Sequence, residues 1–238
     1  MPVRQSHYAL FVIAMVMTVN AWAEIVNSLN PNPPKANITR PLAPQYRIEA
    51  DGSVVLRLCF NSSCARTKML TFSAADMEKV KGQLAYCPGQ NLDDQLQRVR
   101  NAVWQMEVLA QKYEPLLVND LEVNDREYGV DGRMDCVDNA SNTTNYLAVL
   151  TDLGQLPSWR VEAPSVRKPL DFNAMHWTAV VKDKVTGKKW AVDSWFRPNG
   201  HLPFVLPLNL WQVETRGWLP PHDALNPYPH ASNELCRM

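Results

Sequence analysis

The strongest constraint on the fold is an apolar stripe that runs through residues 92 to 113. Its members recur at alternating steps of four and three residues until Pro115 interrupts the pattern, which predicts a long helix with one buried face. A coiled coil is an alternative, but the stripe covers only about three heptads and equally fits packing against a helix or sheet within one domain. The stripe consists of Leu92, Leu96, Val99, Val103, Met106, Ala110 and Tyr113.

The segment before this helix has an extended pattern. From Tyr46, two apolar stretches flank the turn Asp51-Gly52, and a return strand continues through Phe72. Ser73 and Asp76 then resemble a capping box at the start of a short helix with a buried face at Met77, Val80 and Leu84. We therefore expect a small N-terminal β-meander plus a helix.

Composition excludes few functions, but it disfavours one class. Hydrophobic residues make up 46% of the 238 residues and charged residues 20%, as in globular proteins. Lys and Arg together number 24, as do Asp and Glu, so no net charge attracts nucleic acid or an anionic membrane. We expect no nucleic-acid binding, and the balanced total leaves a local charged patch open.

The first residues resemble a targeting signal. Arg4 precedes an apolar run from Tyr8 to Val19, and Ala21-Trp22-Ala23 matches the small-x-small cleavage pattern. The run is shorter than the ~20 residues that span a bilayer, so an uncleaved anchor is the weaker alternative. We expect a signal peptide at 1–23 with cleavage after Ala23, no later transmembrane segment, and a periplasmic or secreted protein.

Five cysteines in an oxidising compartment leave one thiol over. Cys59 and Cys64 bracket a tight turn and are the first candidate pair. Cys87 and Cys236 are a plausible second pair, although sequence alone does not fix connectivity. Cys136 is then the odd cysteine.

Cys136 lies where a helix is expected to begin. Asp135 is a candidate N-terminal cap, and a buried face over residues 146 to 153 precedes Gly154, which ends the helix. In the first turn of a helix, free N–H groups and the helix dipole stabilise a thiolate. This position predicts a lowered thiol pKa for Cys136.

His176 and Asp193 lie on two strand-like segments that flank a loop containing Thr186-Gly187. A four-residue loop from Lys184 to Gly187 would place Asp193 opposite Thr178, one step along the same face from His176, and a two-residue loop would place the two residues directly opposite. A slip by one residue would separate them. Either of the first two registers lets the carboxylate reach the imidazole.

Nucleophilic catalysis needs a thiol, an imidazole that takes its proton, and a carboxylate that orients the imidazole. Cys136, His176 and Asp193 supply these groups, so we expect them to be the catalytic residues. Each of the three also has a structural interpretation, as a buried cysteine, a strand histidine and an aspartate near a turn. The leftover cysteine favours the catalytic interpretation.

These residues resemble the transglutaminase-like superfamily, and in particular the bacterial transglutaminase-like cysteine proteinases. The matching features are Cys136-x-Asp138-x-Ala140 at the start of a helix that ends at Leu153-Gly154, His176 at the start of a strand, and Trp190-x-x-Asp193 on the next. The resemblance covers about residues 92 to 212. It implies an α+β, papain-like core in which the Cys-bearing helix packs on an antiparallel β-sheet.

The expected organisation is then a signal peptide (1–23), a Pro/Asn-rich lead-in (24–45), the N-terminal meander and short helix (46–90), and a catalytic core with a Pro-rich tail (91–238). The resemblance implies a cysteine-dependent hydrolase that cleaves peptide or amide bonds of a cell-envelope protein through an acyl thioester. A noncatalytic binding module on the same fold and a cross-linking transglutaminase are the alternatives.

Some members of this family hold calcium with acidic residues around the nucleophile. Asp135 and Asp138 match that pattern, but Val137 stands where those members have Glu, and hard cations need several oxygen ligands. We therefore expect no cofactor, with Asp135 and Asp138, helped by Asp125 or Asp131, as the candidate ligands if calcium binds. The remaining histidines, His201, His222 and His230, lack the spacing of a zinc site, and we expect them at the surface.

Two features of the expected site stay open at the level of sequence. The oxyanion would be held by the backbone N–H of Cys136 and by one further donor, for which Asn119, Asn124 and Trp104 are unranked candidates. The first half of the Cys136 helix is unusually polar. Its residues Asn139, Ser141 and Asn142 either line a cleft or face solvent, and solvent exposure is the expectation for these residue types.

Overall fold

The computed structural model describes residues 40–85, 91–123, 129–167 and 175–213, all of which belong to one unit of the chain. The predicted signal peptide, most of the lead-in and the C-terminal tail lie outside the described residues. Within them, the elements follow the order of a three-stranded sheet, two helices, a central helix and a four-stranded sheet.

The first sheet is the predicted meander. Its strands are β1 (Tyr46–Ile48), β2 (Val54–Phe60) and β3 (Arg66–Phe72), each antiparallel to the next. Leu56 pairs with Tyr46 on one side and with Leu70 on the other. Val54, Leu56 and Leu58 alternate along β2 with no exposed surface, which buries one face of the sheet as period-two alternation predicts.

Two helices follow the meander. α2 (Ala74–Ala85) begins after Ser73, whose hydroxyl accepts the N–H of Asp76 at 3.2 Å, and it buries the predicted Met77, Val80 and Leu84. α3 (Leu92–Tyr113) is the predicted long helix, and it is followed by a short 3-10 turn, η1 (Pro115–Asn119). The predicted stripe is buried except at its two ends, because Leu92 is exposed and Tyr113 is half-buried.

The second sheet is antiparallel with the strand order β4-β5-β6-β7. Its strands are β4 (Trp159–Arg167), β5 (His176–Asp183), β6 (Lys189–Asp193) and β7 (Phe204–Pro207), and α5 (Leu208–Val213) follows directly. Because strands are added in chain order, β4 pairs within the described residues only with β5 and forms an edge of the sheet.

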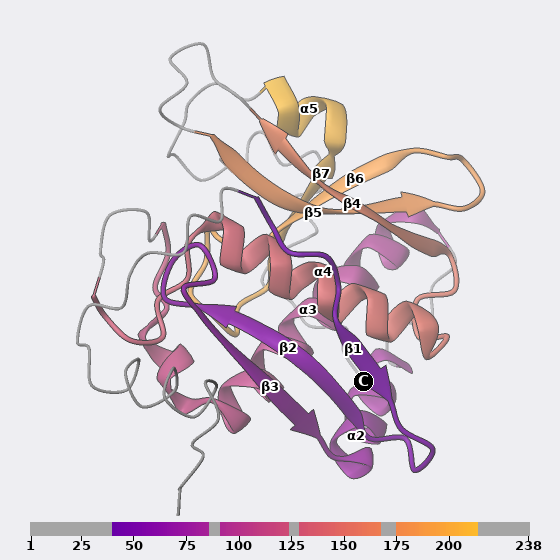
Figure 1. Cartoon of the computed structure of the whole chain (residues 1–238). Coiled ribbons are helices and arrows are strands. Elements are labelled where there is room, and N and C mark those ends of the chain that lie inside the picture. Colours follow the sequence, from indigo (N-terminus) through magenta and orange to yellow (C-terminus); the bar gives the residue numbers. More distant parts are fainter. Residues whose placement is uncertain (1–39, 86–90, 124–128, 168–174, 214–238) are drawn as a thin grey trace, which may run out of the picture. The chain divides into compact units, whose positions relative to one another are not determined.

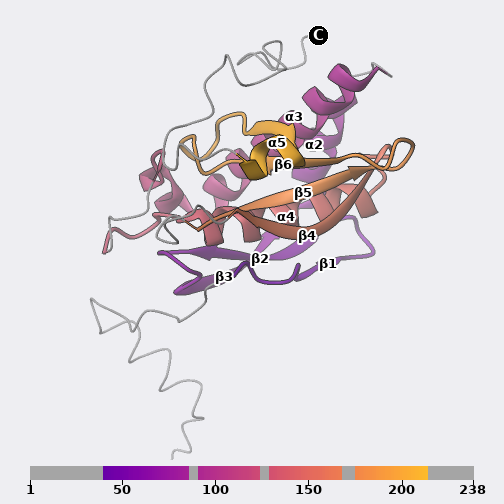
Figure 2. The same cartoon turned by 90° about the horizontal axis from the view of Figure 1, so that it is seen from above.

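The central helix α4 (Cys136–Asp152) contacts both sheets, and Figures 1 and 2 show it between the violet meander and the orange second sheet. Tyr146, Leu147, Val149 and Leu150 are buried in the main core as predicted. Gly154, with φ of +71°, follows the helix at its C-terminus. The α+β class, the N-terminal meander with helices and the Cys-bearing helix packed on an antiparallel sheet are thus confirmed.

No helix among the described residues combines the length and the apolar character needed to cross a membrane.

Candidate functional site

The start of α4 is fixed by its own sequence. The Asp135 carboxylate accepts the N–H groups of Val137 and Asp138, each at 3.0 Å, and the Asp138 carboxylate accepts the N–H of Asp135 at 3.2 Å. This reciprocal capping box makes Cys136 the first residue of the helix. The approach of the chain to this helix start requires glycine at position 132, because a Cβ there would lie 1.9 Å from the carbonyl oxygen of Leu116.

A disulfide loop holds the same helix start from the side of the meander. Cys59 and Cys64 form the predicted bridge. The last four residues of the loop that it closes, 61 to 64, have φ values of +52° to +68°. This left-handed turn points the N–H and hydroxyl of Ser63 at the Asp135 carboxylate, at 2.8 and 2.9 Å. The N–H of Cys64 donates to Asp138. The loop therefore binds both carboxylates of the capping box.

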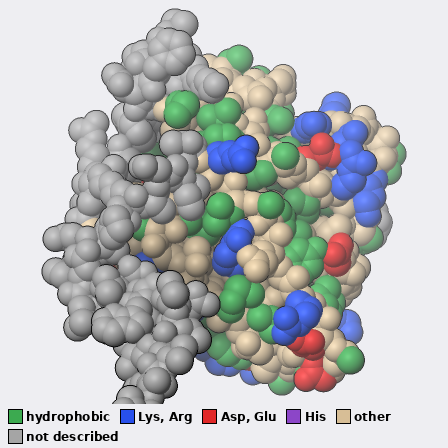
Figure 3. Space-filling view, viewed as in Figure 1, with side chains coloured by type: hydrophobic (Ala, Val, Ile, Leu, Met, Phe, Trp, Pro, Cys, Tyr) green, Lys and Arg blue, Asp and Glu red, His purple; other side chains and the backbone are tan. Residues whose placement is uncertain are grey.

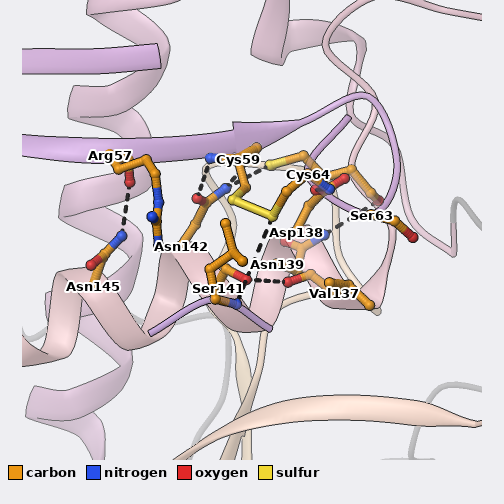
Figure 4. Close-up of a disulfide and its surroundings, with 12 residues drawn as sticks. Arg57, Cys59, Ser63, Cys64, Val137, Asp138, Asn139, Ser141, Asn142 and Asn145 are labelled. Atoms are coloured by element: carbon orange, nitrogen blue, oxygen red, sulfur yellow. Dashed lines mark hydrogen bonds between the residues drawn. A yellow bond between two sulfur atoms is a disulfide. The ribbon is translucent and has the colours of Figure 1, made fainter. Parts of the chain in front are cut away.

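The polar face of α4 is buried, so the expectation that it faces solvent is wrong. Asn139, Ser141 and Asn142 are at most 5% exposed. Figure 4 shows Asn142 and Asn145 pointing from α4 toward strand β2, where they bond the backbone of Cys59 and Arg57. These amides bond the part of β2 that extends past the short strand β1, and this is why polar residues occupy this face of α4.

His176 and Asp193 meet as the four-residue loop predicts. Val181 pairs with Trp190 and Ala179 with Val192, a register that brings Asp193 opposite Thr178. Nε2 of His176 lies 2.7 Å from Oδ2 of Asp193, and both side chains are 2% exposed. The carboxylate therefore fixes the tautomer and the orientation of the imidazole.

Three large aromatic side chains surround the imidazole. The ring centroids of Trp195, Phe196 and Trp211 lie 4.7, 5.1 and 5.6 Å from that of His176. Nε1 of Trp211 also donates to Oδ2 of Asp193 at 2.8 Å. Sequence reasoning did not identify this role, because Trp211 follows Asp193 by 18 residues and no spacing rule links them. Trp195 and Phe196 form core around the histidine and do not line an open groove.

Cys136 lies beside this pair without a hydrogen bond to it. Its Sγ is 3.9 Å from the carbonyl oxygen of Met175, the residue before His176. Nδ1 of His176 is buried and has no hydrogen-bond partner among the described residues. The structure thus contains the imidazole–carboxylate pair and a neighbouring half-buried thiol, the one free cysteine among the described residues.

The electrostatics of Cys136 differ from the expectation of a lowered pKa. Burial raises the pKa of the thiol, and the negative charge of Asp135 raises it further. The N–H of Trp177, which faces the sulfur, opposes this effect. The helix terminus does not help as predicted, because the Asp135 carboxylate places a full negative charge where the dipole is positive. A thiolate at Cys136 therefore needs a cation beside it.

The two candidate calcium ligands do not fit a calcium ion as the structure holds them. Both oxygens of Asp135 and both of Asp138 accept hydrogen bonds from N–H or hydroxyl groups of the protein. Asp138 also lies near Cys59 and Cys64, but their sulfurs are joined in the disulfide and are not ligands. Asp131 bonds Asn61 and Arg66, and Asp125 lies outside the described residues.

The remaining residues singled out from the sequence are the candidate oxyanion donors, the other histidines and the second cysteine pair. Asn119 donates its amide to the carbonyl of Asp131, and Trp104 lies half-buried on α3. His201 is exposed, as expected. Cys87, Asn124, His222, His230 and Cys236 lie outside the described residues, so the predicted second disulfide stays a prediction.

Comparisons of the chain with family models, with curated proteins and with solved structures found no match.

Proposed function

We propose that this protein is a cysteine-dependent hydrolase that cleaves peptide or amide bonds, with Cys136 as nucleophile, His176 as general base and acid, and Asp193 as the group that orients His176. The observation that carries the proposal is the buried His176–Asp193 pair together with the one described free thiol, whose Sγ lies 3.9 Å from the carbonyl oxygen of Met175, the residue before His176. Burying an imidazole and a carboxylate together is costly unless both are bonded. Here one ring nitrogen is bonded and the other is left over.

The ring nitrogen of His176 that has no hydrogen-bond partner among the described residues determines the route of the proton. Since Nε2 is held by Asp193, Nδ1 takes the Sγ proton after the thiol turns from the Met175 carbonyl toward the ring. The thiolate attacks the carbonyl carbon, and the C–N bond breaks as Nδ1–H gives its proton to the leaving amine. Water, deprotonated by Nδ1, then hydrolyses the acyl thioester to a carboxylate and regenerates the thiol.

The raised thiol pKa is compatible with this reaction. An isolated Cys136 thiolate is disfavoured by burial and by Asp135, whereas a thiolate next to imidazolium is neutral as a pair. Asp193 and the donor Trp211 support the positive ring. The oxyanion would receive the N–H of Cys136, since the Asp135 carboxylate takes the N–H groups of Val137 and Asp138 instead.

The same proposal includes a transglutaminase-like, papain-like core and a place in the periplasm or outside the cell. The Cys59–Cys64 disulfide supports an oxidising compartment. Water is our proposed acceptor, and the substrate is a protein or peptide of the cell envelope. A lysine amine as acceptor would make the enzyme a cross-linking transglutaminase.

The experiment is alkylation of the mature protein by limiting iodoacetamide from pH 5 to 8, with mass-spectrometric mapping of the labelled cysteines. A lone buried thiol with a raised pKa reacts slowly throughout this range, because the thiolate is the nucleophile. We expect Cys136 to label rapidly already near pH 6 and at least tenfold more slowly in His176→Ala. The matched control is His201→Ala, which removes an exposed histidine and should change nothing.

A noncatalytic binding module is the second candidate, favoured by the missing hydrogen bond between Sγ of Cys136 and Nδ1 of His176. In that case labelling would rise only toward alkaline pH and would be the same in His176→Ala. That outcome would contradict the hydrolase.

A further inference from the structure

A groove of about 770 Å³ lies between the N-terminal segment, α4 and β4, and Trp177 lies between one end of it and the proposed nucleophile. One wall is the lead-in segment 40–46, the floor comes from α4 between Thr144 and Asp152, and the other wall is β4 from Arg160 to Pro164. Trp177 lines the groove with its side chain and faces the Cys136 sulfur with its backbone N–H. In Figure 1 the violet lead-in crosses α4 below β4.

The direction of the groove follows from the two elements that line it. α4 starts at Cys136, and β4 ends near the histidine, where Arg167 pairs with His176. The floor from Thr144 to Asp152 is ~12 Å long at 1.5 Å per helical residue. The wall from Arg160 to Pro164 is ~13 Å long at ~3.3 Å per strand residue. About four extended residues fit this length.

The β4 wall offers backbone hydrogen bonds. β4 is an edge strand, and the N–H of Lys184 donates to the carbonyl of Ser158, the residue before it. Because antiparallel pairing alternates, Arg160 and Glu162 turn their backbone groups toward β5, and Val161 turns its N–H and carbonyl toward the open edge. A bulge between Glu162 and Ser165, with Pro164 inside it, limits this edge to a short segment.

The side chains around the groove favour an uncharged occupant. Two basic and two acidic residues line it, and they balance. Arg160 bonds Glu162, and the Tyr46 hydroxyl bonds Asp152. Figure 3 shows this face with hydrophobic, basic and acidic side chains interspersed around its central part. Small residues, among them Ala148 and Ala163, let a backbone approach closely.

From these observations we infer that the groove binds an extended, uncharged polypeptide segment of about four residues, which adds as a strand to β4 and continues past Trp177 toward Cys136. The inference rests on the proposed hydrolase and names its substrate class. Strand addition to an open sheet edge gives affinity through the backbone, and pockets for alternate side chains give selectivity.

The test compares two alkylating agents on Cys136. Acetyl-octaalanyl chloromethyl ketone is long enough to fill the groove and to span the ~12 Å from Thr144 to Cys136. This reagent and chloroacetone form the same C–S bond with loss of chloride, and the thiol proton leaves through His176. Only the first can occupy the groove. We expect the peptide reagent to react at least tenfold faster than chloroacetone, and N-methylation of its backbone amides to remove most of this advantage.

Ala163→Trp fills the groove from an exposed position on β4 and should abolish the rate advantage of the peptide reagent over chloroacetone. Val185→Trp is the matched control, because Val185 lies at the exposed tip of the β5–β6 hairpin. An equal rate for the two reagents, or an advantage that survives Ala163→Trp, would overturn the inference.

A binding measurement separates this failure from that of the hydrolase. In Cys136→Ser, acetyl-tetraalanine amide should perturb the NMR signals of groove residues, and Ala163→Trp should remove the effect. Absence of these perturbations overturns the groove even if Cys136 is reactive. Their presence with an unreactive thiol keeps the groove and overturns the hydrolase.

Discussion

Asn142 bonds both backbone groups of Cys59: its Oδ1 accepts the N–H and its Nδ2 donates to the carbonyl, each at 2.7 Å. One side chain of α4, the helix that begins at the proposed nucleophile, thereby completes the hydrogen bonding of strand β2 in the N-terminal sheet. The meander and α4 are held together by polar contacts that are as specific as a strand pairing, and the disulfide lies at their centre (Figure 4).

Asn142→Ala should destabilise the protein more than most polar substitutions. It leaves a buried N–H and a buried carbonyl without partners, and each such group costs ~1–3 kcal/mol. We expect the free energy of unfolding in urea to fall by about 3 kcal/mol. Thr151→Ala is the control on the same helix, since the Thr151 hydroxyl has no hydrogen-bond partner among the described residues. Equal losses in the two variants would show that the Asn142 bonds contribute nothing.

Reduction of the Cys59–Cys64 bridge should loosen the start of α4. Closing a loop of this length stabilises a protein by about 2 kcal/mol in the chain-entropy model. Without the bridge, four consecutive non-glycine residues have no cross-link that holds them at positive φ, a conformation that costs energy. We expect dithiothreitol to lower the midpoint of thermal unfolding in a Cys136→Ser background.

The double variant Cys59→Ala/Cys64→Ala, made in that same background, is the control for other disulfides. Without dithiothreitol, its midpoint of thermal unfolding should already be lowered. Dithiothreitol should then lower this midpoint less than it does when the Cys59–Cys64 bridge is present. A wild-type midpoint in the double variant would mean that the loop is held by its contacts with Asp135 and Asp138 alone.

The sequence predicts this fold where one local pattern decides it. The stripe from Leu96 to Ala110 and the alternation along β2 each depend on near neighbours and on burial alone, and both are confirmed. The pairing of His176 with Asp193 was predictable for the same reason, because one loop length sets the register. The Cys59–Cys64 pair followed from a short separation in the chain.

The errors arose where a distant segment changes the environment of a residue. Asn142 resembles a solvent-exposed helix residue until β2 is placed against it, 83 positions earlier in the chain. The pKa of Cys136 was predicted from the helix dipole, but burial and the neighbouring Asp135 decide its direction. Trp211 reaches Asp193 only because β7 pairs with β6 and α5 then packs against β6 and β4.

Glu107 predicts an unusual dependence of stability on pH. Burial raises its pKa well above the ordinary value, and the charge of Asp120 adds to this, whereas the N–H of Gly200 and the hydroxyl of Ser194 oppose it. A carboxyl group with a raised folded-state pKa stabilises the fold below its unfolded pKa of about 4.3, and this contribution is lost as pH rises toward the folded value.

Glu107→Gln should therefore flatten the fall in unfolding free energy above pH 4.3, which for one such group is up to about 1.4 kcal/mol per pH unit. The measurement is urea unfolding at several pH values between 4 and 8. The unfolding free energy of the variant should still fall with pH, because burial also raises the pKa of Asp138. Identical profiles for wild type and Glu107→Gln would show that Glu107 keeps an ordinary pKa in the folded protein.

Trp211→Phe separates the hydrogen bond of Trp211 from its packing. The phenyl ring preserves most of the contact with His176 but cannot donate to Asp193, so the carboxylate loses one of its two partners. A bond to a charged group contributes ~1.5–3 kcal/mol, so Asp193 should hold the imidazole of His176 in place less well. We expect iodoacetamide to label Cys136 about tenfold more slowly at pH 6. Trp104→Phe, on α3, is the control for loss of an indole. Equal slowing in Trp104→Phe would show that the Trp211 bond to Asp193 does not position His176.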